Sequence, residues 1–307
     1  MSNVLQIKKK IKKFNKKIKV SGDKSLSIRW VLLASQSTGK SKAYNLLMSE
    51  DVVAAIDCIK KLGVKVKIQK NFCEIFGNGL GGFKYKKGLT LNARNSGTLG
   101  RLVLGLLASS PKKIKLIGDK SLSKRDFSRV TIPLQKFGAK FYYRIKNKLP
   151  LTILGSKSTK DIKYLENKGS AQCKSAIMLA ALNSLGTTSI KAKKSRNHTE
   201  LLFKYLRVPI KIKSTKKYDF INIKKPKKIP SFNYQIPGDI SSSAFFIVLT
   251  VLANSSKLLI KDVNINFSRI GVITILKKMG AKILLKNKKN YRGEVISDLL
   301  IKSSKNL

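Results

Sequence analysis

Four segments of the chain share one plan, and this internal repetition is the feature that most limits how the chain can fold. The segments span residues 21–68, 95–141, 169–212 and 238–283. Each opens with glycine or small polar residues, continues into a strongly apolar helix, and then forms a short strand, a second helix and another strand. Helices that bury an apolar stripe against sheets are typical of α/β proteins. The sequence therefore predicts an α/β fold built from repeated helix-strand-helix-strand units.

The first helix of each segment is apolar on almost every side, as in IRWVLLA, GRLVLGLLA and SAFFIVLTVLA. Such a helix is expected to be buried on most sides, with its polar N-terminal end facing whatever the segments surround. A helix N-terminus attracts anions because its N–H groups and its dipole favour negative charge. Ordinary capping is a sufficient explanation for one polar helix N-terminus. Several such N-termini in one chain indicate a substrate with more than one anionic group.

Cations gather at three of these helix starts, where they oppose the helix dipole and cost stability. An anion bound between them would offset that cost. Ser25 and Arg29 are four residues apart and share one helix face. The candidate residues are Lys24, Ser25 and Arg29 in the first segment, Gly97, Arg101 and Arg125 in the second, and Ser170, Gln172, Arg196 and His198 in the third.

The net charge of +50 has two interpretations. A basic surface collects nucleic-acid phosphates, which predicts binding that weakens steeply with salt and surface aromatics for base stacking. The cations are, however, 55 lysines and only 10 arginines, spread along the whole chain. Proteins that read bases rely on arginine, whose planar fork grips phosphate and guanine. We therefore attribute the net charge to a proteome that is rich in lysine, and keep nucleic-acid binding as the weaker alternative.

The three cysteines, Cys58, Cys73 and Cys173, show no CxxC spacing, which indicates a reducing compartment and argues against a disulfide framework or zinc site. The one histidine of the chain rules out His-rich metal sites. Residues 1–20 contain no apolar leader segment, and no apolar run approaches the ~20 residues of a membrane span. These features predict a soluble, cytoplasmic protein with no membrane association.

Six short motifs make the sequence resemble the enolpyruvyl transferases, and among them the 5-enolpyruvylshikimate-3-phosphate synthases of the bacterial class II type. The motifs are SGDKSLSIR, NSGTLGRL, SLSKRDFSRV, GSAQCKSA, SRNHTE and PGDISSSAFF, in family order across residues 20–283. The related branch that acts on UDP-N-acetylglucosamine typically has Lys-Asn in place of Lys24-Ser25 and a reactive cysteine in the loop matching residues 118–125. This chain has neither feature.

The resemblance implies transfer of the carboxyvinyl group of phosphoenolpyruvate to the 5-hydroxyl of 3-phosphoshikimate, with release of phosphate, on the shikimate pathway to chorismate and aromatic amino acids. It implies no metal or organic cofactor, no nucleic-acid partner, and a monomer when the enzyme is complete. By motif match, Lys24, Ser25, Arg29, Ser170, Gln172 and Arg196 would contact 3-phosphoshikimate, and Lys24, Gly97, Arg125 and Gln172 would contact phosphoenolpyruvate.

The same resemblance implies two domains of three repeats each, an inside-out α/β barrel. Residues 22–236 would form one complete domain, while residues 1–21 and 237–307 would form an incomplete second domain with one of its three repeats. The catalytic acid and base are then expected beyond Leu307, so the 307-residue chain itself is expected to be inactive. The alternative is a non-catalytic remnant that binds 3-phosphoshikimate.

Two further residues carry expectations from their positions. Cys173 lies on an apolar helix and is expected to serve packing. His198 is expected at a helix start near the substrate phosphate or at a plain surface position, rather than as a general base.

Overall fold

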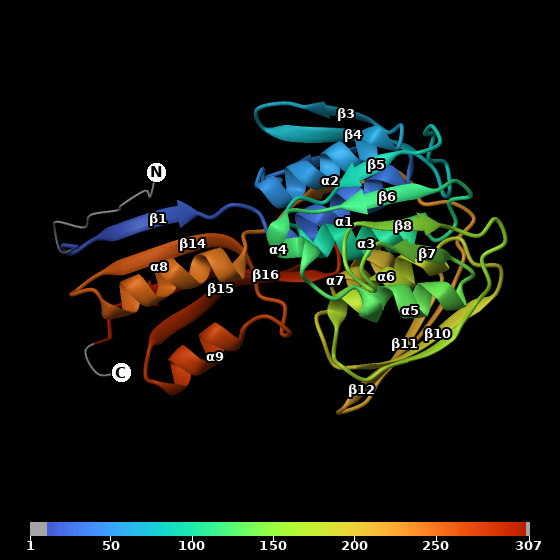
Figure 1. Ribbon diagram of the computed structural model, residues 1–307. Coiled ribbons are helices and arrows are strands. Elements are labelled where there is room, and N and C mark those ends of the chain that lie inside the picture. Colours follow the sequence, from blue (N-terminus) through green and yellow to red (C-terminus); the bar gives the residue numbers. More distant parts are fainter. Residues whose placement is uncertain (1–10, 305–307) are drawn as a thin grey trace. The chain divides into compact units, whose positions relative to one another are not determined.

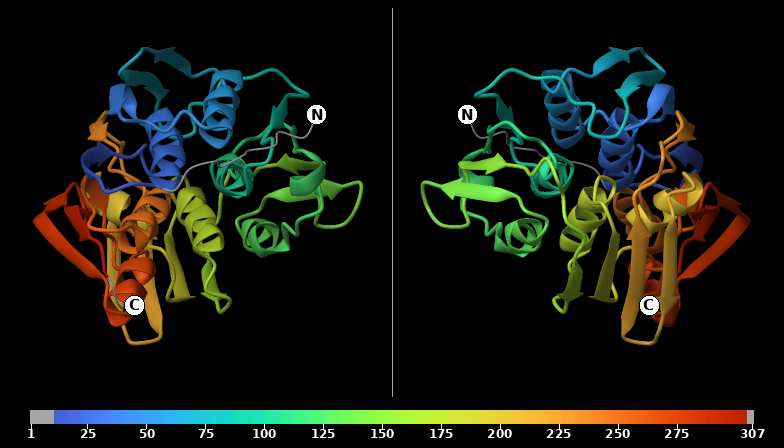
Figure 2. Two further views of the ribbon diagram at one scale, coloured as in Figure 1. Left: turned by 90° about the vertical axis from the view of Figure 1, so that its left-hand side faces the viewer. Right: turned by 90° about the vertical axis from the view of Figure 1, so that its right-hand side faces the viewer.

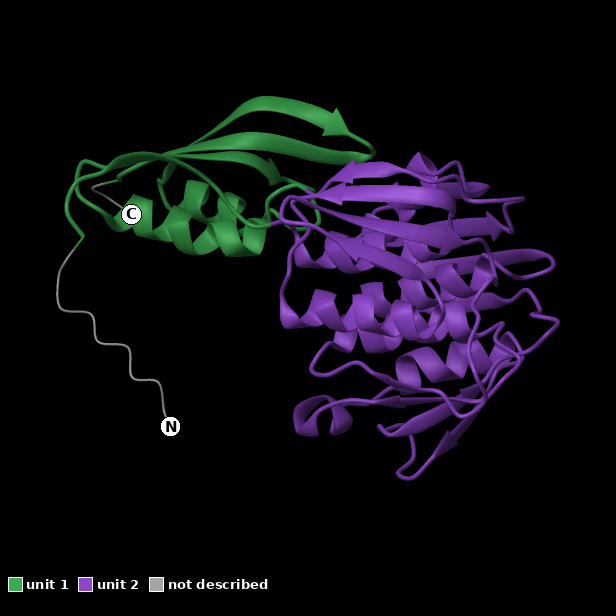
Figure 3. Ribbon diagram, turned by 90° about the horizontal axis from the view of Figure 1, so that it is seen from above, with its two compact units in different colours: residues 1–21, 237–307 green, residues 22–236 purple. Residues whose placement is uncertain are grey.

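The computed structural model describes residues 11–304, so residues 1–10 and 305–307, which the sequence analysis assigns to the second domain, lie outside the described range. Figure 1 shows a mixed α/β fold with four small sheets. The chain divides into two compact units, residues 22–236 and residues 1–21 with 237–307 (Figure 3).

Three repeats of helices belong to the unit that spans residues 22–236. Each repeat contributes an apolar central helix and a more amphipathic outer helix, and the second repeat also has a one-turn helix. The central helices are α1 (Lys24–Ser35), α3 (Gly97–Leu107) and α6 (Ala171–Ala181), and the others are α2 (Glu50–Lys61), α4 (Lys120–Ser123), α5 (Ser128–Lys136) and α7 (His198–Tyr205). In Figure 2 the central helices lie inside this unit, with strands at its periphery.

Three four-stranded sheets cover these helices, and all three have the same topology. In each, a short first strand runs parallel to the strand that follows the central helix, and two antiparallel strands complete the sheet. The first sheet has the order β13 (Asn233–Gln235), β2 (Thr38–Tyr44), β4 (Phe72–Asn78), β3 (Lys65–Ile68); the second β5 (Thr90–Asn92), β6 (Ile114–Ile117), β8 (Leu151–Leu154), β7 (Lys140–Tyr143); the third β9 (Lys163–Glu166), β10 (Thr187–Lys193), β12 (Tyr218–Lys224), β11 (Ile210–Ser214).

The central helices pack more closely than ordinary side chains would permit. All residues of α1 from Leu26 to Ser35 are buried, as expected for a helix that is apolar on every side. On α3, a Cβ atom built at Gly105 would lie 2.3 Å from the carbonyl oxygen of Ala176 on α6. The missing side chain thus lets the backbones of α3 and α6 approach each other.

The unit of residues 1–21 and 237–307 contains one repeat of the same type. Its elements are α8 (Ile240–Leu252), α9 (Gly271–Lys278) and a sheet in the order β1 (Asn15–Lys19), β14 (Lys257–Asn264), β16 (Glu294–Lys302), β15 (Lys282–Tyr291). The parallel strand β1 comes from the start of the chain, far in sequence from β14. Ile247, Ile260 and Leu299 belong to the buried core of this unit.

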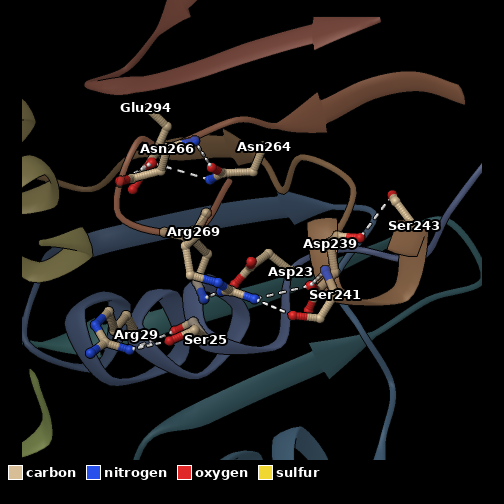
Figure 4. A network of polar contacts seen from close by, with 11 residues as sticks. Asp23, Ser25, Arg29, Asp239, Ser241, Ser243, Asn264, Asn266, Arg269 and Glu294 are labelled. Atoms are coloured by element: carbon tan, nitrogen blue, oxygen red, sulfur yellow. Dashed lines mark hydrogen bonds and ion pairs between the residues drawn. The ribbon is translucent and has the colours of Figure 1, made fainter. Parts of the chain in front are cut away.

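Polar contacts fix the start of α8 within this unit (Figure 4). The carboxylate of Asp239 accepts a hydrogen bond from the backbone N–H of Ser241 at 2.7 Å and caps the helix. Arg269 Nη2 donates to Asp239 Oδ1 at 3.2 Å and to Ser241 Oγ at 2.7 Å. Asp239 therefore has a structural role.

Among the described residues, no helix has both the length and the apolar character that crossing a membrane requires. Within the same part of the chain, no group of three or more His, Cys, Asp or Glu side chains could hold a metal ion.

Candidate anion-binding site

The N-terminal ends of α1, α3 and α6 are each capped by a side chain. Asp23 accepts from the N–H of Leu26 at 2.9 Å, and Ser96 accepts from the N–H of Leu99 at 3.2 Å. Ser170, a predicted substrate contact, accepts from the N–H of Cys173 at 3.2 Å. A helix start has four N–H groups without an intrahelical partner, so one cap leaves the end of the helix electropositive.

Arg29 is buried and connects three helices. Arg29 shares a helix face with Ser25, as the four-residue spacing predicts, and its Nη1 donates to the Ser25 hydroxyl at 2.7 Å and to the Ser25 carbonyl at 3.1 Å (Figure 4). Its Nε donates to Thr199 Oγ1 on α7 at 2.8 Å, and its Nη2 donates to Ser175 Oγ on α6 at 3.0 Å. The guanidinium is therefore held in one orientation at the start of α1.

Gln172 links α6 to α3 by two hydrogen bonds. Its Oε1 accepts from Arg101 Nη1 at 2.7 Å, and its Nε2 donates to Thr98 Oγ1 at 3.1 Å. Arg101 also donates through Nη2 to the carbonyl of Asp126 at 3.1 Å. Since Ser175 lies one turn further along α6, this helix is bonded to both α1 and α3 near their N-terminal ends.

Two guanidinium groups lie over the first residue of α3. A Cβ atom built at Gly97 would be 3.1 Å from Arg101 Nη1 and 3.2 Å from Arg125 Nη1. Arg125 is exposed, and its Nη2 lies 3.5 Å from Asn95 Oδ1. The absence of a side chain at Gly97 therefore leaves room for two cations beside a helix start, a suitable arrangement for a carboxylate or phosphate.

The electrostatics of this cluster favour an anion. Burial lowers the pKa of Arg101, and the nearby charges of Arg129 and Arg125 lower it further. Like charges held together are relieved when a negative group binds between them. The backbone N–H of Leu122, which donates to Asp119 at 2.6 Å, lowers the pKa of that carboxyl, so Asp119 stays ionised as the cap of α4.

Ser170 caps α6, and Lys24 and Arg196 are two further predicted site residues. Lys24 is the first residue of α1, and its Nζ lies 3.5 Å from Asp51 Oδ2 on α2. Arg196 is exposed in the connection between β10 and α7. The structure thus brings together Ser25 with Arg29, and Gly97 with Arg125, Arg101 and Gln172.

Two expectations about single residues can be compared with the structure. His198 is the first residue of α7, as expected, but it is fully buried, so the surface alternative is wrong. The reason is that the first turn of α7 packs inward through His198, Thr199 and Glu200. Cys173 is buried, and burial raises the pKa of its thiol to about 12, in agreement with a packing role.

Three residues of the networks are not among the substrate contacts that the motif match implies: Arg101, Ser175 and Thr199. A signal for Arg101 was present, because Gly97 and Arg101 repeat on α3 the four-residue spacing of Ser25 and Arg29 on α1. Ser175 and Thr199 carry no comparable signal. Their hydroxyls meet only because α6 and α7 pack together.

Comparison with known proteins agrees with this geometry. A family model described as EPSP synthase (3-phosphoshikimate 1-carboxyvinyltransferase) matches residues 8–299. The chain belongs to the EPSP synthase family. It is 38% identical to a 3-phosphoshikimate 1-carboxyvinyltransferase of Caldicellulosiruptor bescii, over 95% of this chain and 67% of the relative. It is 36% identical to the Bacillus subtilis protein of the same name, over 96% of this chain and 68% of that protein.

A solved structure gives the same result for the fold. The EPSP synthase of Acinetobacter baumannii superposes with a TM-score of 0.86 at 34% identity, over 95% of this chain and 65% of that one. The chain therefore spans about two thirds of the length of the relatives that it matches.

Proposed function

We propose that this chain is part of an enzyme that transfers the carboxyvinyl group of phosphoenolpyruvate to the 5-hydroxyl of 3-phosphoshikimate. The observation that supports this most directly is that arginines at the starts of α1 and α3 are both hydrogen-bonded to α6, in a chain whose family carries that activity in its name. Both substrates carry a phosphate and a carboxylate. A site for them needs several fixed cations close together.

The hydrogen-bond network of Arg29 and that of Gln172 are assigned to different substrates. Arg29 and Ser25, with Lys24, Ser170, Gln172 and Arg196, are proposed to hold 3-phosphoshikimate. Gly97 and Arg125, with Lys24 and Gln172, are proposed to hold phosphoenolpyruvate. Gln172, on the helix that is bonded to both α1 and α3, is suited to contact both ligands.

The proposed reaction requires three proton movements. The 5-oxygen of 3-phosphoshikimate attacks C2 of phosphoenolpyruvate and loses its proton, while C3 of phosphoenolpyruvate gains one. The resulting tetrahedral adduct then loses phosphate, with loss of a proton from the methyl carbon. Fixed cations stabilise the charge of the adduct, whereas a general acid and base must move the protons.

We further propose that these proton-transfer groups belong to a part of the enzyme outside the 307 residues. The supporting fact is that the chain spans about two thirds of its relatives. The chain by itself would then bind 3-phosphoshikimate weakly, with undetectable turnover. The architecture proposed for the whole protein is three repeats in each domain, with residues 22–236 as one complete domain, acting as a cytoplasmic monomer.

The proposal is tested by calorimetric titration of the chain with 3-phosphoshikimate, with shikimate as the ligand that lacks the phosphate. We expect measurable binding of 3-phosphoshikimate and none of shikimate. Phosphoenolpyruvate binding should weaken in Arg125→Gln, with Arg144→Gln as the matched control, because Arg144 is also exposed in the same unit. Absence of 3-phosphoshikimate binding, or equal losses in both variants, would contradict the assignment.

A turnover assay tests whether the 307 residues contain the general acid and base. Release of phosphate at an ordinary enzymatic rate would show that the 307 residues contain their own acid and base. Binding of 3-phosphoshikimate without release of phosphate is the expected result, but a non-catalytic protein that binds 3-phosphoshikimate would give the same result. Adding the remaining third of a relative distinguishes these two alternatives, since turnover recovers only if the chain is part of an enzyme.

A further inference from the structure

Two adjacent pairs of side chains join α6 to α7. Lys174 and Ser175 are neighbours on α6, and Thr199 and Glu200 are neighbours on α7. Lys174 Nζ lies 2.6 Å from Glu200 Oε1, and the Ser175 and Thr199 hydroxyls lie 2.7 Å apart. All four residues are buried, with at most 3% of any of them exposed.

Stability alone is a weak explanation for the charged pair. Taking two charges out of water costs free energy that their attraction repays only in part, and apolar residues of similar size often serve a core equally well. What the two pairs provide together is a fixed register. A slide of α7 along α6 by one residue would separate Lys174 from Glu200 and Ser175 from Thr199 at the same time.

The hydroxyl pair ends at the guanidinium of Arg29. The Nε and Nη2 groups of an arginine point in the same direction and form one edge of its fork. In Arg29 these two groups donate to Thr199 and Ser175, whose hydroxyls also bond to each other. The three side chains thus form a closed ring. The Nη1 group, on another edge, donates to Ser25 (Figure 4).

We propose that Thr199 and Ser175 are positioning residues for Arg29, and that the Lys174–Glu200 ion pair holds α7 where Thr199 can reach it. The ring fixes the Nε–Nη2 edge, so the guanidinium presents its Nη1 end beside Ser25 at the start of α1. The consequence for 3-phosphoshikimate rests on the proposed function. The positioning of Arg29 itself does not.

The first test follows the Nε–H proton of Arg29 by NMR, with the signal assigned by its loss in Arg29→Lys. Thr199→Val keeps the shape of the side chain and removes the acceptor, so solvent exchange of this proton should become at least tenfold faster. Thr199→Ser restores the hydroxyl and should restore slow exchange. Thr188→Val is the matched control, because Thr188 is equally buried in the same unit and its hydroxyl bonds to Ser184.

The second test measures 3-phosphoshikimate affinity in the same variants by calorimetry. Because a hydrogen bond to a charged group contributes more free energy than one between neutral groups, Thr199→Val should lower the affinity about tenfold. The affinity of Thr199→Ser should stay within about threefold of the parent. Glu200→Leu combined with Lys174→Met should weaken binding in the same direction without unfolding the protein. Ser175→Ala, which removes the other hydroxyl, serves if Thr199→Val does not fold.

The outcomes separate the proposals. Unchanged exchange of the Arg29 Nε proton in both Thr199→Val and Ser175→Ala would overturn the positioning role. Equal loss of affinity in Thr199→Val and Thr188→Val would also overturn it, since general destabilisation would then explain both. If the parent chain binds no 3-phosphoshikimate, the proposed function fails, and the exchange rates still decide the role of the ring.

Discussion

At the scale of single residues, much of the site consists of pairs of residues four positions apart at helix starts. Ser25 and Arg29 share one face of α1, as their spacing predicts, and form a hydrogen bond of 2.7 Å. Gly97 and Arg101 on α3 have the same spacing, with glycine in place of serine. The hydroxyl in one repeat binds the arginine, whereas its absence in the other leaves space between two guanidinium groups.

Substituting Gly97 with alanine should therefore impair anion binding rather than folding. The new methyl group would lie 3.1 and 3.2 Å from the guanidinium nitrogens of Arg101 and Arg125, so these flexible side chains must shift. We expect phosphoenolpyruvate affinity to fall by about tenfold, with the melting temperature nearly unchanged, because fixed charge positions determine such binding.

The control for this substitution is Gly271→Ala. Gly271 is also the first residue of a helix, but a Cβ atom there would meet nothing within 4 Å. Isothermal titration with phosphoenolpyruvate measures both variants. Parent-like affinity in Gly97→Ala would show that the positions of the two guanidinium groups do not determine phosphoenolpyruvate binding.

The three cysteines should behave as packing residues. Burial raises the pKa of Cys58 and Cys173 to about 12 and that of Cys73 to about 11. Only the thiolate reacts, so a disulfide reagent at pH 8 should label none of them rapidly in the folded chain and all three in denaturant. Rapid labelling of the folded protein would indicate an exposed or activated thiol.

The same burial gives the stability a pH dependence with a definite sign. The unfolded thiols lose their protons near pH 9, while the folded thiols keep theirs to about pH 11 or 12. The unfolded state therefore binds fewer protons in this window, and stability falls as pH rises from 9. Denaturant unfolding at pH 8 and pH 10 should show this decrease in stability. A variant in which all three cysteines are replaced by serine, and which still folds, should lack it.

At the scale of elements, the repeats predicted the helices better than the sheets. The apolar runs marked the central helices, and α2 bears acidic residues in its first turn and lysines in its last, as a helix dipole favours. The first strand of each sheet was harder to predict. β1 and β13 pair with β14 and β2, which lie more than a hundred residues away in the sequence, so no local pattern could reveal these partners.

Close approach of α3 and α6 depends on Gly105. A methyl group there would lie 2.3 Å from the Ala176 carbonyl, and a backbone atom cannot move aside as a side chain can. Overpacking of this kind costs more than the gain in helix propensity, so Gly105→Ala should lower the free energy of unfolding by about 2 kcal/mol.

Gly100→Ala is the matched variant on the same helix. Its methyl group would meet the Phe127 ring at 3.4 Å, near an ordinary contact distance, and should be neutral or slightly stabilising. Urea denaturation of both variants measures the difference. Equal stabilities would show that α3 and α6 do not require contact between their backbones at Gly105.

At the scale of the whole molecule, motif order was the strongest predictor. Each string, such as SGDKSLSIR or SRNHTE, places one helix start, and their sequence along the chain placed it in the family that the comparisons found. The exposed side chain of Arg196, in contrast, lies in the connection between β10 and α7, and no sequence pattern specifies which side chains meet there.

The two units differ in how far they bury their central helices. Residues 26–35 of α1 are all buried, whereas α8 exposes the apolar side chains of Phe245, Phe246, Val248, Leu249 and Leu252. Their spacing places most of them along one face of the helix. Phe245 and Leu252 are 79% and 67% exposed, and an apolar surface of this kind drives association in water.

The chain should therefore self-associate as its concentration rises, and Phe245→Ser combined with Leu252→Ser should reduce that association without lowering the stability of residues 22–236. Both side chains are largely exposed, so their loss creates no cavity. Sedimentation velocity over a range of micromolar concentrations measures the effect. Leu185→Ser is the control, because Leu185 is 76% exposed in the other unit. A parent chain that stays monomeric throughout, or an equal effect of Leu185→Ser, would show that the α8 face does not drive association.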